Sequence, residues 1–273
     1  MKEKAKKHKF ISISLVTLAL ALIIAIAFGY NRLKEIYLKQ CVIKNMETQV
    51  IINSGRMVKS DIIAENFGLK KGVNLALIDF KKKREELLAR IPNLRNITVT
   101  RHLPDKVVIT IEEREPVARL EPRRGRATGR VADIEGMVFL WQRDTRQLPV
   151  IYEKTQPGFL PGKRLTGRAL AALRLLATAK SLAYSEVNLL NADIAHLDYI
   201  SSTLGSNYST LHIAWEDMDE EEFTSKSRES LMRQLTHLRD AIRSNLAEDS
   251  KIWNATEFST GRIYADTQRK LYQ

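Results

Sequence analysis

The sequence predicts an α+β protein in which an N-terminal transmembrane helix is followed by a β-α-α-β-β module and then by a mixed β-domain with two flanking helices. Three observations predict this order. An uncharged apolar run, residues 10–28, follows a lysine-rich tail. Two helical patterns then precede a pair of strands with period-2 alternation at 97–111. Further strand patterns, interrupted by two helical ones, fill residues 116–266.

The N-terminal run has the length and the flanking charge of a membrane span. At about 1.5 Å per residue it covers about 28 Å, close to the thickness of a bilayer core. Five lysines and one glutamate lie in residues 2–9, so the positive-inside rule places the tail 1–9 in the cytoplasm and the rest of the chain across the membrane. We therefore expect a span at 10–30 and a connector at 31–42. The alternative is a cleaved signal peptide, because Ala25-Ile26-Ala27 resembles a cleavage site.

The overall composition limits the possible functions. Lysine and arginine number 44 against 32 acidic residues, a net charge of +12, which favours acidic partners. The single cysteine, Cys41, excludes an intramolecular disulfide and any site built from several cysteines. An apolar content of 44% is that of a chain with a real buried core.

The first folded module begins with a strand at 48–53. A short helix follows, with Ser60 as its expected N-cap and Gly68 ending it in the left-handed conformation. Asp79 is placed to cap a second helix, which Pro92 ends. Two helices and three strands of this kind form one layer of helices on one sheet.

The module closes with a β-hairpin. Strands at 97–100 and 107–112 flank a turn at Pro104-Asp105, and Pro116 ends the second strand because it cannot donate to a ladder. A sheet of three strands has open edges, and an open edge can accept a strand from another chain. The module is therefore a natural docking unit.

An arginine-rich loop at 119–130 lies near the start of the second domain. We interpret this loop as solvent-exposed rather than nucleic-acid-binding, because no aromatic side chain interleaves with its arginines. Beyond it we expect a hairpin that turns at Glu135-Gly136 and a helix capped by Thr166. The remaining elements expected are strands at 149–151, 187–192, 196–200 and 210–215, a helix after the acidic run 216–222, and terminal strands around 252–253 and 262–265.

The sequence contains none of the short catalytic motifs that we sought. Its five histidines are scattered, and there is no H-E-x-x-H pair, G-x-S-x-G elbow, S-x-x-K motif or Walker loop. The acidic run 216–222 lacks the glycine and the alternation of a calcium loop. We therefore expect no enzyme activity, no cofactor and no metal.

The order of these motifs resembles the FtsQ/DivIB family of bacterial cell-division proteins. The resemblance covers about residues 1–165, and further on only the layout of elements agrees. The residues that carry it are Leu69 to Asp79 (LKKGVNLALID), Ile91-Pro92, Val99, Arg101, Leu103-Pro104-Asp105, Glu113, Pro116-Val117-Ala118, Val131, Asp133, Gly136, Val138 and Phe139.

The resemblance implies a POTRA domain at 43–115, a family-specific β-domain at 116–266 and a mobile tail at 267–273. It also implies a non-catalytic scaffold of the divisome, single-pass in the cell inner membrane and enriched at the septum, which binds FtsB- and FtsL-like bitopic proteins and helps control septal peptidoglycan synthesis. Other division proteins would bind through the POTRA domain, and no nucleic acid is implied. Two other functions stay open: a POTRA-bearing protein of export or outer-membrane assembly, and a membrane-anchored envelope enzyme.

Two groups of site residues follow from the resemblance. In the family the partner adds a strand at the terminal edge of the β-domain. The segment that looks similar here contains Phe258, Ser259, Thr260, Gly261, Ile263 and Tyr264. The acidic, arginine-containing strand expected just before it is replaced by Trp253-Asn254-Ala255-Thr256. The second group, structural or partner-facing, lies at the hairpin and its exit: Arg101, Pro104, Asp105, Glu113 and Pro116.

Overall fold

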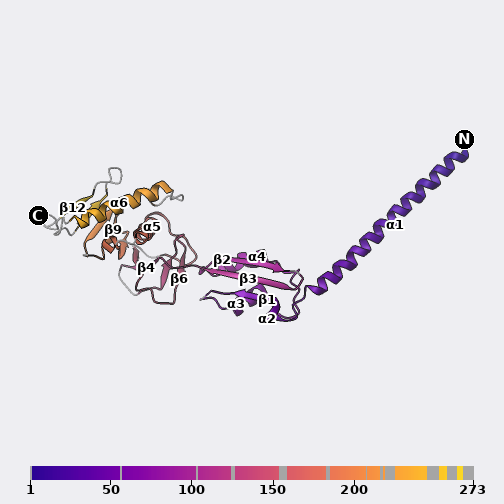
Figure 1. Cartoon of the computed structure of the whole chain (residues 1–273), viewed down its shortest axis with the longest axis horizontal. Coiled ribbons are helices and arrows are strands. Elements are labelled where there is room, and N and C mark those ends of the chain that lie inside the picture. Colours follow the sequence, from indigo (N-terminus) through magenta and orange to yellow (C-terminus); the bar gives the residue numbers. More distant parts are fainter. Residues whose placement is uncertain are drawn as a thin grey trace. The chain divides into compact units, whose positions relative to one another are not determined.

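The fold is described from a computed structural model of the chain. The structure describes residues 2–266 apart from 56, 103, 124–126, 154–158, 183–184, 207, 216–217, 219–224, 245–251 and 257–262. For residues 2–19, 153, 185, 226, 264 and 266 only the backbone is described. The chain divides into two compact units, Met1–Leu88 with Asn96–Glu113, and Ala89–Arg95 with Arg114–Gln273. Each unit is taken by itself below (Figure 1).

Unit 1 begins with the long helix α1, Lys2–Gln40. Large apolar side chains from Leu20 to Phe28 along this helix are exposed, with more than half of their surface free. Within the described side chains, which start at residue 20 in α1, no helix has the length and apolar character needed to cross a membrane. The first half of the expected span, residues 10–19, lies outside these described side chains.

The rest of unit 1 has the predicted β-α-α-β-β order. Its elements are α2 (Met46–Gln49), β1 (Val50–Asn53), α3 (Ser60–Phe67), α4 (Phe80–Arg90), β2 (Leu94–His102) and β3 (Lys106–Glu113). The sheet order is β1-β3-β2, and β1 runs parallel to β3 with Val50 opposite Val107. Val107, Ile109 and Ile111 alternate with more exposed residues along β3, so one sheet face is buried. Phe67 of α3 and Phe80 of α4 join the core with ring centroids 5.8 Å apart.

Local capping explains where the elements of unit 1 begin and end. The Asp79 carboxylate accepts from the Lys82 N–H at 3.0 Å, as predicted for a cap, and Gly68 ends α3 with φ of 69°. Two details of the prediction are wrong. The N-cap of α3 is Lys59, and Ser60 is the first helical residue. The first strand starts at Val50, because Gln49 accepts backbone N–H groups at both 44 and 45 and closes the helical turn α2.

Unit 2 holds a mixed nine-stranded sheet of order β12-β11-β10-β9-β8-β7-β4-β5-β6. Buried residues of α5 and α6 share one core with the inward-facing strand residues, such as Leu211 and Trp253, so both helices cover the same face. The elements are β4 (Ala118–Pro122), β5 (Arg130–Ala132), β6 (Val138–Leu140), β7 (Val150–Glu153), α5 (Gly167–Ser181), the 3₁₀ turn η1 (Ser185–Val187), β8 (Asn191–Asp193), β9 (Ile200–Thr203), β10 (Thr210–Ile213), α6 (Ser225–Arg243), β11 (Ile252–Ala255) and β12 (Tyr264–Asp266).

Most predicted elements of unit 2 are found, including the hairpin that turns at Gly136, whose φ is 79°. The loop expected at 119–130 is wrong at both ends, because residues 119–122 belong to β4, which pairs with β5 and β7, and Arg130 begins β5. The strands expected at 187–192 and 196–200 are wrong in their bounds: β8 begins at Asn191 and β9 at Ile200. The reason is tertiary. The Arg168 guanidinium donates to the carbonyl oxygens of Ile194 and His196, which holds 194–199 as a loop.

Candidate docking site

The last strand of the chain, β12, forms one edge of the nine-stranded sheet. It pairs antiparallel with β11, with Asn254 opposite Tyr264, Trp253 opposite Ala265 and Ile252 opposite Asp266. Among the described residues no strand pairs with its outer side. Within the described part of the chain, the outer side of β12 is therefore an open sheet edge.

The inner neighbour of this edge is firmly packed. Strand β11 runs parallel to β10, with Leu211 opposite Trp253. Trp253 is 4% exposed and shares the core with Leu231 and Leu235 of α6. Strand β11, with which β12 pairs, is therefore anchored in the core of unit 2.

Of the six residues predicted for partner binding, only two are described. Phe258, Ser259, Thr260 and Gly261 lie outside the described residues. Ile263 is partly buried and packs against the core of unit 2. Tyr264 begins β12, where its backbone pairs with Asn254. The structure thus places the described part of the predicted segment at the sheet edge.

The opposite edge of the same sheet is covered. The Val138 N–H of β6 donates to the Lys163 carbonyl at 2.9 Å, and the Gly162 N–H donates to the Val138 carbonyl at 2.8 Å. Met137 and Arg164 form a further bridge. The chain after β7 therefore closes the β6 edge, and the two edges of this sheet differ in access.

The predicted hairpin residues lie where β2 ends and β3 begins, in unit 1. The Arg101 guanidinium lies 4.7 Å from the centroid of the Phe80 ring, a cation–π geometry. Pro104 and Asp105 form the described part of the turn between β2 and β3. Among the described residues, Arg101, Pro104 and Asp105 form no hydrogen bond, ion pair or ring contact with another residue of the predicted site.

Glu113 has a structural role at the end of β3. Its Oε1 accepts the backbone N–H groups of Met57 and Val58 at 2.7 and 2.8 Å, which fixes the loop before α3. The chain passes so close that a Cβ on Gly55 would lie 2.2 Å from the Glu113 Cδ. A larger residue at position 55 would therefore displace the Glu113 carboxylate from these two N–H groups.

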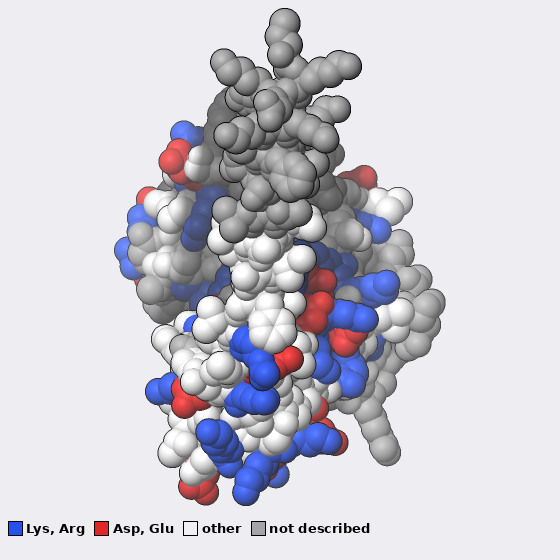
Figure 2. Space-filling view, turned by 90° about the vertical axis from the view of Figure 1, so that its right-hand side faces the viewer, with Lys and Arg blue, Asp and Glu red and all other residues white. Residues whose placement is uncertain are grey.

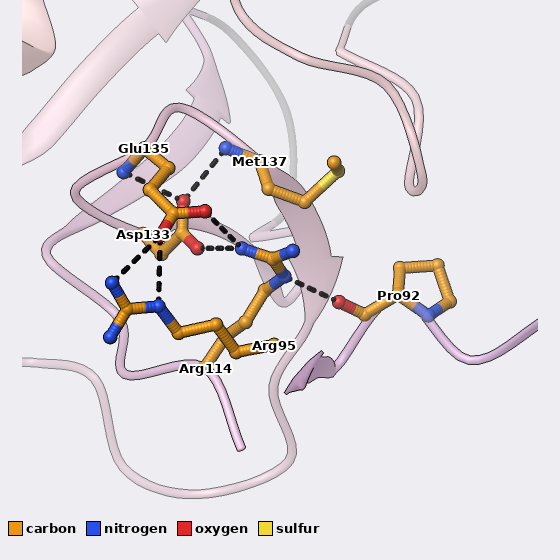
Figure 3. Close-up of polar contacts among 6 residues, drawn as sticks. All are labelled: Pro92, Arg95, Arg114, Asp133, Glu135 and Met137. Carbon is orange, nitrogen blue, oxygen red and sulfur yellow. Dashed lines mark hydrogen bonds and ion pairs between the residues drawn. The ribbon is translucent and has the colours of Figure 1, made fainter. Parts of the chain in front are cut away.

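A buried ion cluster lies just after Glu113 (Figure 3). Arg114 Nη1 donates to an oxygen of Asp133 and, at 3.0 Å, to Glu135, while its Nε donates to the Pro92 carbonyl at 3.1 Å. The side chains of Arg114 and Asp133 are 9% and 4% exposed. Arg95 binds Glu135 from the other side at 2.8 Å. The cluster ties 92–95 and Arg114 to the turn between β5 and β6.

The turn itself is organised by Asp133. Its Oδ1 accepts the backbone N–H groups of Glu135 and Met137 at 3.0 and 2.8 Å. Burial raises the pKa of Glu135, but hydrogen bonds from Arg114 and Arg95 and their charges outweigh it, so this pKa lies below its ordinary value. The Glu135 carboxyl is therefore ionised at neutral pH. Pro116, two residues after Arg114, is half-buried at the entry to β4.

A stack of three rings marks the sheet face opposite the helices of unit 2. Tyr199 lies between His196 and His212, with both pairs of ring centroids 4.4 Å apart. Burial, and then the charge of His196, lower the pKa of His212. Across the described side chains, no group of three or more His, Cys, Asp or Glu residues is arranged to hold a metal ion.

Comparison with known proteins identifies the first module. The profile of the family described as POTRA domain, FtsQ-type, matches residues 48–114. The chain contains an FtsQ-type POTRA domain. It is also distantly homologous to the cell division protein DivIB of Clostridium acetobutylicum, with 30% identity over 66 residues, 24% of this chain. The match spans about a quarter (26%) of the relative's length.

These matches bear out the family resemblance over the POTRA domain, residues 48–114. Sequence reasoning missed the Arg114 cluster. A signal was present, because an arginine between two glutamates at a strand exit is followed by a D-x-E-G turn, but charged residues at such a place are usually solvated. Nothing in the spacing shows that Arg114 and Asp133 meet in a buried position.

Proposed function

We propose that this protein is a non-catalytic, FtsQ/DivIB-like scaffold of bacterial cell division. The observation that carries the proposal is the FtsQ-type POTRA domain, together with the distant homology to DivIB. The mixed β-domain that follows supports the proposal, because on the outer side of β12 no described strand pairs, whereas the β6 edge is covered by backbone of the same chain.

The proposed docking element is β12 with the segment 258–264 before it. A bitopic FtsB- or FtsL-like partner would add a strand to β12, gaining backbone hydrogen bonds that depend little on side-chain identity. Phe258 and Tyr264 would supply apolar anchors. The burial of Trp253 supports this use of the edge, because it anchors β11, the strand with which β12 pairs.

The proposal includes membrane anchoring. The uncharged run 10–28 and the exposed apolar side chains from Leu20 onward along α1 support a single pass, with the lysine-rich tail in the cytoplasm. The folded units would then lie outside the cytoplasm, at the inner membrane of the septum. Regulation of septal peptidoglycan synthesis would follow from the partners that the scaffold gathers.

A proline scan of β12 tests the docking element. Proline at Tyr264, Ala265 or Asp266 removes one N–H. In an antiparallel edge strand, successive N–H groups point alternately towards β11 and away from it. We expect proline at an outward-facing position to abolish co-purification of bitopic division proteins while the denaturation midpoint is kept. Proline at an inward-facing position should lower that midpoint as well.

Phe258→Ala provides a matched side-chain test, and a fluorescent fusion provides the cellular one. We expect Phe258→Ala to reduce co-purification and the fusion to form a band at midcell during constriction. Partner binding that is unchanged in every proline variant and in Phe258→Ala would rule out β12 as the docking element. A uniform envelope signal would argue against the division function itself.

A further inference from the structure

One loop of the POTRA domain is bound to the end of helix α1. This loop, residues 68–79, joins α3 to α4, and we call it the α3–α4 loop. The Asn74 side-chain amide donates to the Leu38 carbonyl, in the last turn of α1, at 2.7 Å. Backbone hydrogen bonds of 2.8–2.9 Å join residues 41–43 to residues 72–75 of the loop. The loop and the C-terminal end of α1 are therefore held together.

The attachment sets the distance between the loop and the proposed membrane span. Helix α1 continues unbroken from the span to Gln40. Eight residues separate Tyr30, at the end of the expected span, from Leu38, which is about 12 Å along the helix. Lipid headgroups occupy about 5–8 Å of this length. Charges on the loop therefore lie within a Debye length, about 8 Å at physiological ionic strength, of the headgroups.

The loop and the helix end beside it carry an excess of positive charge. Residues 31–47 and 68–79 contain six lysines and arginines against three acidic residues. Lys70 and Lys71 lie in the loop, are exposed and form no ion pair with any described residue. Figure 2 is viewed from the side on which α1 leaves unit 1, and Lys and Arg side chains outnumber Asp and Glu around the base of the helix. This charge suits an anionic surface.

An exposed leucine lies on the same loop. Leu77 is 74% exposed, and Asn74, the residue that binds α1, fixes its position. Asn74 Oδ1 accepts the Ala76 N–H at 2.9 Å, and the Asn74 carbonyl accepts the Leu77 N–H at 3.1 Å. Large apolar side chains are also exposed on the adjoining part of α1, at Leu33 and Ile36. A single exposed leucine is ordinary, but lysines beside exposed apolar side chains are the composition of segments that lie at a membrane interface.

We propose that the α3–α4 loop is a membrane-facing surface of the POTRA domain, on which Lys70 and Lys71 bind the phosphate groups of anionic lipids and Leu77 enters the headgroup layer. This inference rests on the single-pass anchoring put forward under the proposed function. Because the loop is hydrogen-bonded to α1, lipid contact at the loop would fix the orientation of the POTRA domain on the bilayer. The surface shares no residue with the β12 edge, so partner docking and lipid contact can fail independently.

The test uses the full chain with Cys41→Ala, reconstituted in vesicles of phosphatidylcholine with or without phosphatidylglycerol. A fluorophore is attached at Leu77→Cys or, as the matched site, at Lys59→Cys; Lys59 is exposed and follows Val58, which binds Glu113 at the other end of the sheet. A spin label on the lipid headgroup should quench the fluorophore at 77 more strongly than at 59 when phosphatidylglycerol is present. At 1 M salt the Debye length shrinks to about 3 Å, and quenching at 77 should fall at least about two-fold.

A pair of charge variants tests the two lysines. Lys70→Gln/Lys71→Gln should lower quenching at 77 at least about two-fold, because each lysine near an anionic bilayer contributes up to about a five-fold preference. Lys59→Gln/Arg90→Gln, an equal charge change at exposed residues outside the loop, should leave quenching at 77 unchanged. An equal response to the two variants would overturn the proposal. Quenching at 77 that needs no phosphatidylglycerol, or that rises with the protein-to-lipid ratio, would indicate contact between copies and would overturn it too.

Flotation of the same vesicles in high salt separates the loop from the anchor. A chain that floats but is quenched equally at 77 and 59 keeps its anchor and refutes the lipid contact of the loop. A chain that does not float overturns both the anchor and this surface. None of these measurements involves a division partner, so they leave the docking role of β12 to its own test.

Discussion

Removing the Arg114 guanidinium should destabilise unit 2 strongly. Arg114→Met keeps the apolar stem and much of the volume but removes the charge and all three hydrogen-bond contacts. Breaking a buried ion pair by deleting one member costs about 3–5 kcal/mol. Asp133 keeps two backbone donors, and Glu135 is about a third exposed (32%), so the loss should lie at the low end, about 3 kcal/mol.

The assay is chemical denaturation at neutral pH followed by tryptophan fluorescence. All three tryptophans, Trp141, Trp215 and Trp253, lie in unit 2, so the signal reports on this unit alone. The matched control is Arg95→Met, because Arg95 binds the same Glu135 from a side chain that is 46% exposed. This control should cost less than about 1 kcal/mol.

A double-mutant cycle separates the pair from the rest of the cluster. Asp133→Asn keeps the shape and removes the charge, so Arg114→Met combined with Asp133→Asn should cost clearly less than the sum of the two single changes. A loss below about 1 kcal/mol for Arg114→Met, or strict additivity in the cycle, would refute the buried-pair reasoning.

Three further predictions concern titration and close packing. The pKa of Glu135 is lowered in the folded state, so its stabilising effect is complete above its ordinary pKa of 4.5 and is lost as pH falls through the folded pKa; Glu135→Gln should remove this acid-side loss in denaturation curves measured across that range. The pKa of His212, followed by NMR, should lie below its ordinary value of 6.5. The stability that the neutral imidazole contributes is then complete above pH 6.5 and decreases as the pH falls below 6.5. A titration midpoint above 6.5 would contradict the burial argument. Gly55→Ala should push the Glu113 carboxylate away from its two backbone donors and lower the free energy of unfolding by about 1–3 kcal/mol. Hydrogen exchange at the Met57 and Val58 amides should become faster, and unchanged exchange would contradict the role of these two hydrogen bonds.

The elements that local chemistry determines were predictable. Alternation of Val107, Ile109 and Ile111 indicated the face of β3 that is buried, and Asp79 and Gly68 marked helix ends through bonds within a few residues. These signals act over short distances along the chain, so a single sequence contains them in full.

The features that long-range contacts determine were not predictable. Residues 196–199 alternate like a strand, but Arg168, 26 and 28 positions away from its acceptors, holds them as a loop. The Arg114–Asp133 pair joins residues 19 apart, and its burial depends on the chain at Pro92. Such contacts become visible only when the elements are in place.

The two edges of the nine-stranded sheet are built differently, and this difference bears on docking. An open edge is an aggregation hazard, and proteins usually cover, shorten or charge it. Here the chain after β7 covers β6 with backbone bonds from 162 to 165, yet β12, at the other end of the same sheet, stays open among the described residues. This difference between the two edges of one sheet is what favours β12 over β6 as the proposed docking element, because only a strand with a free side can accept another strand.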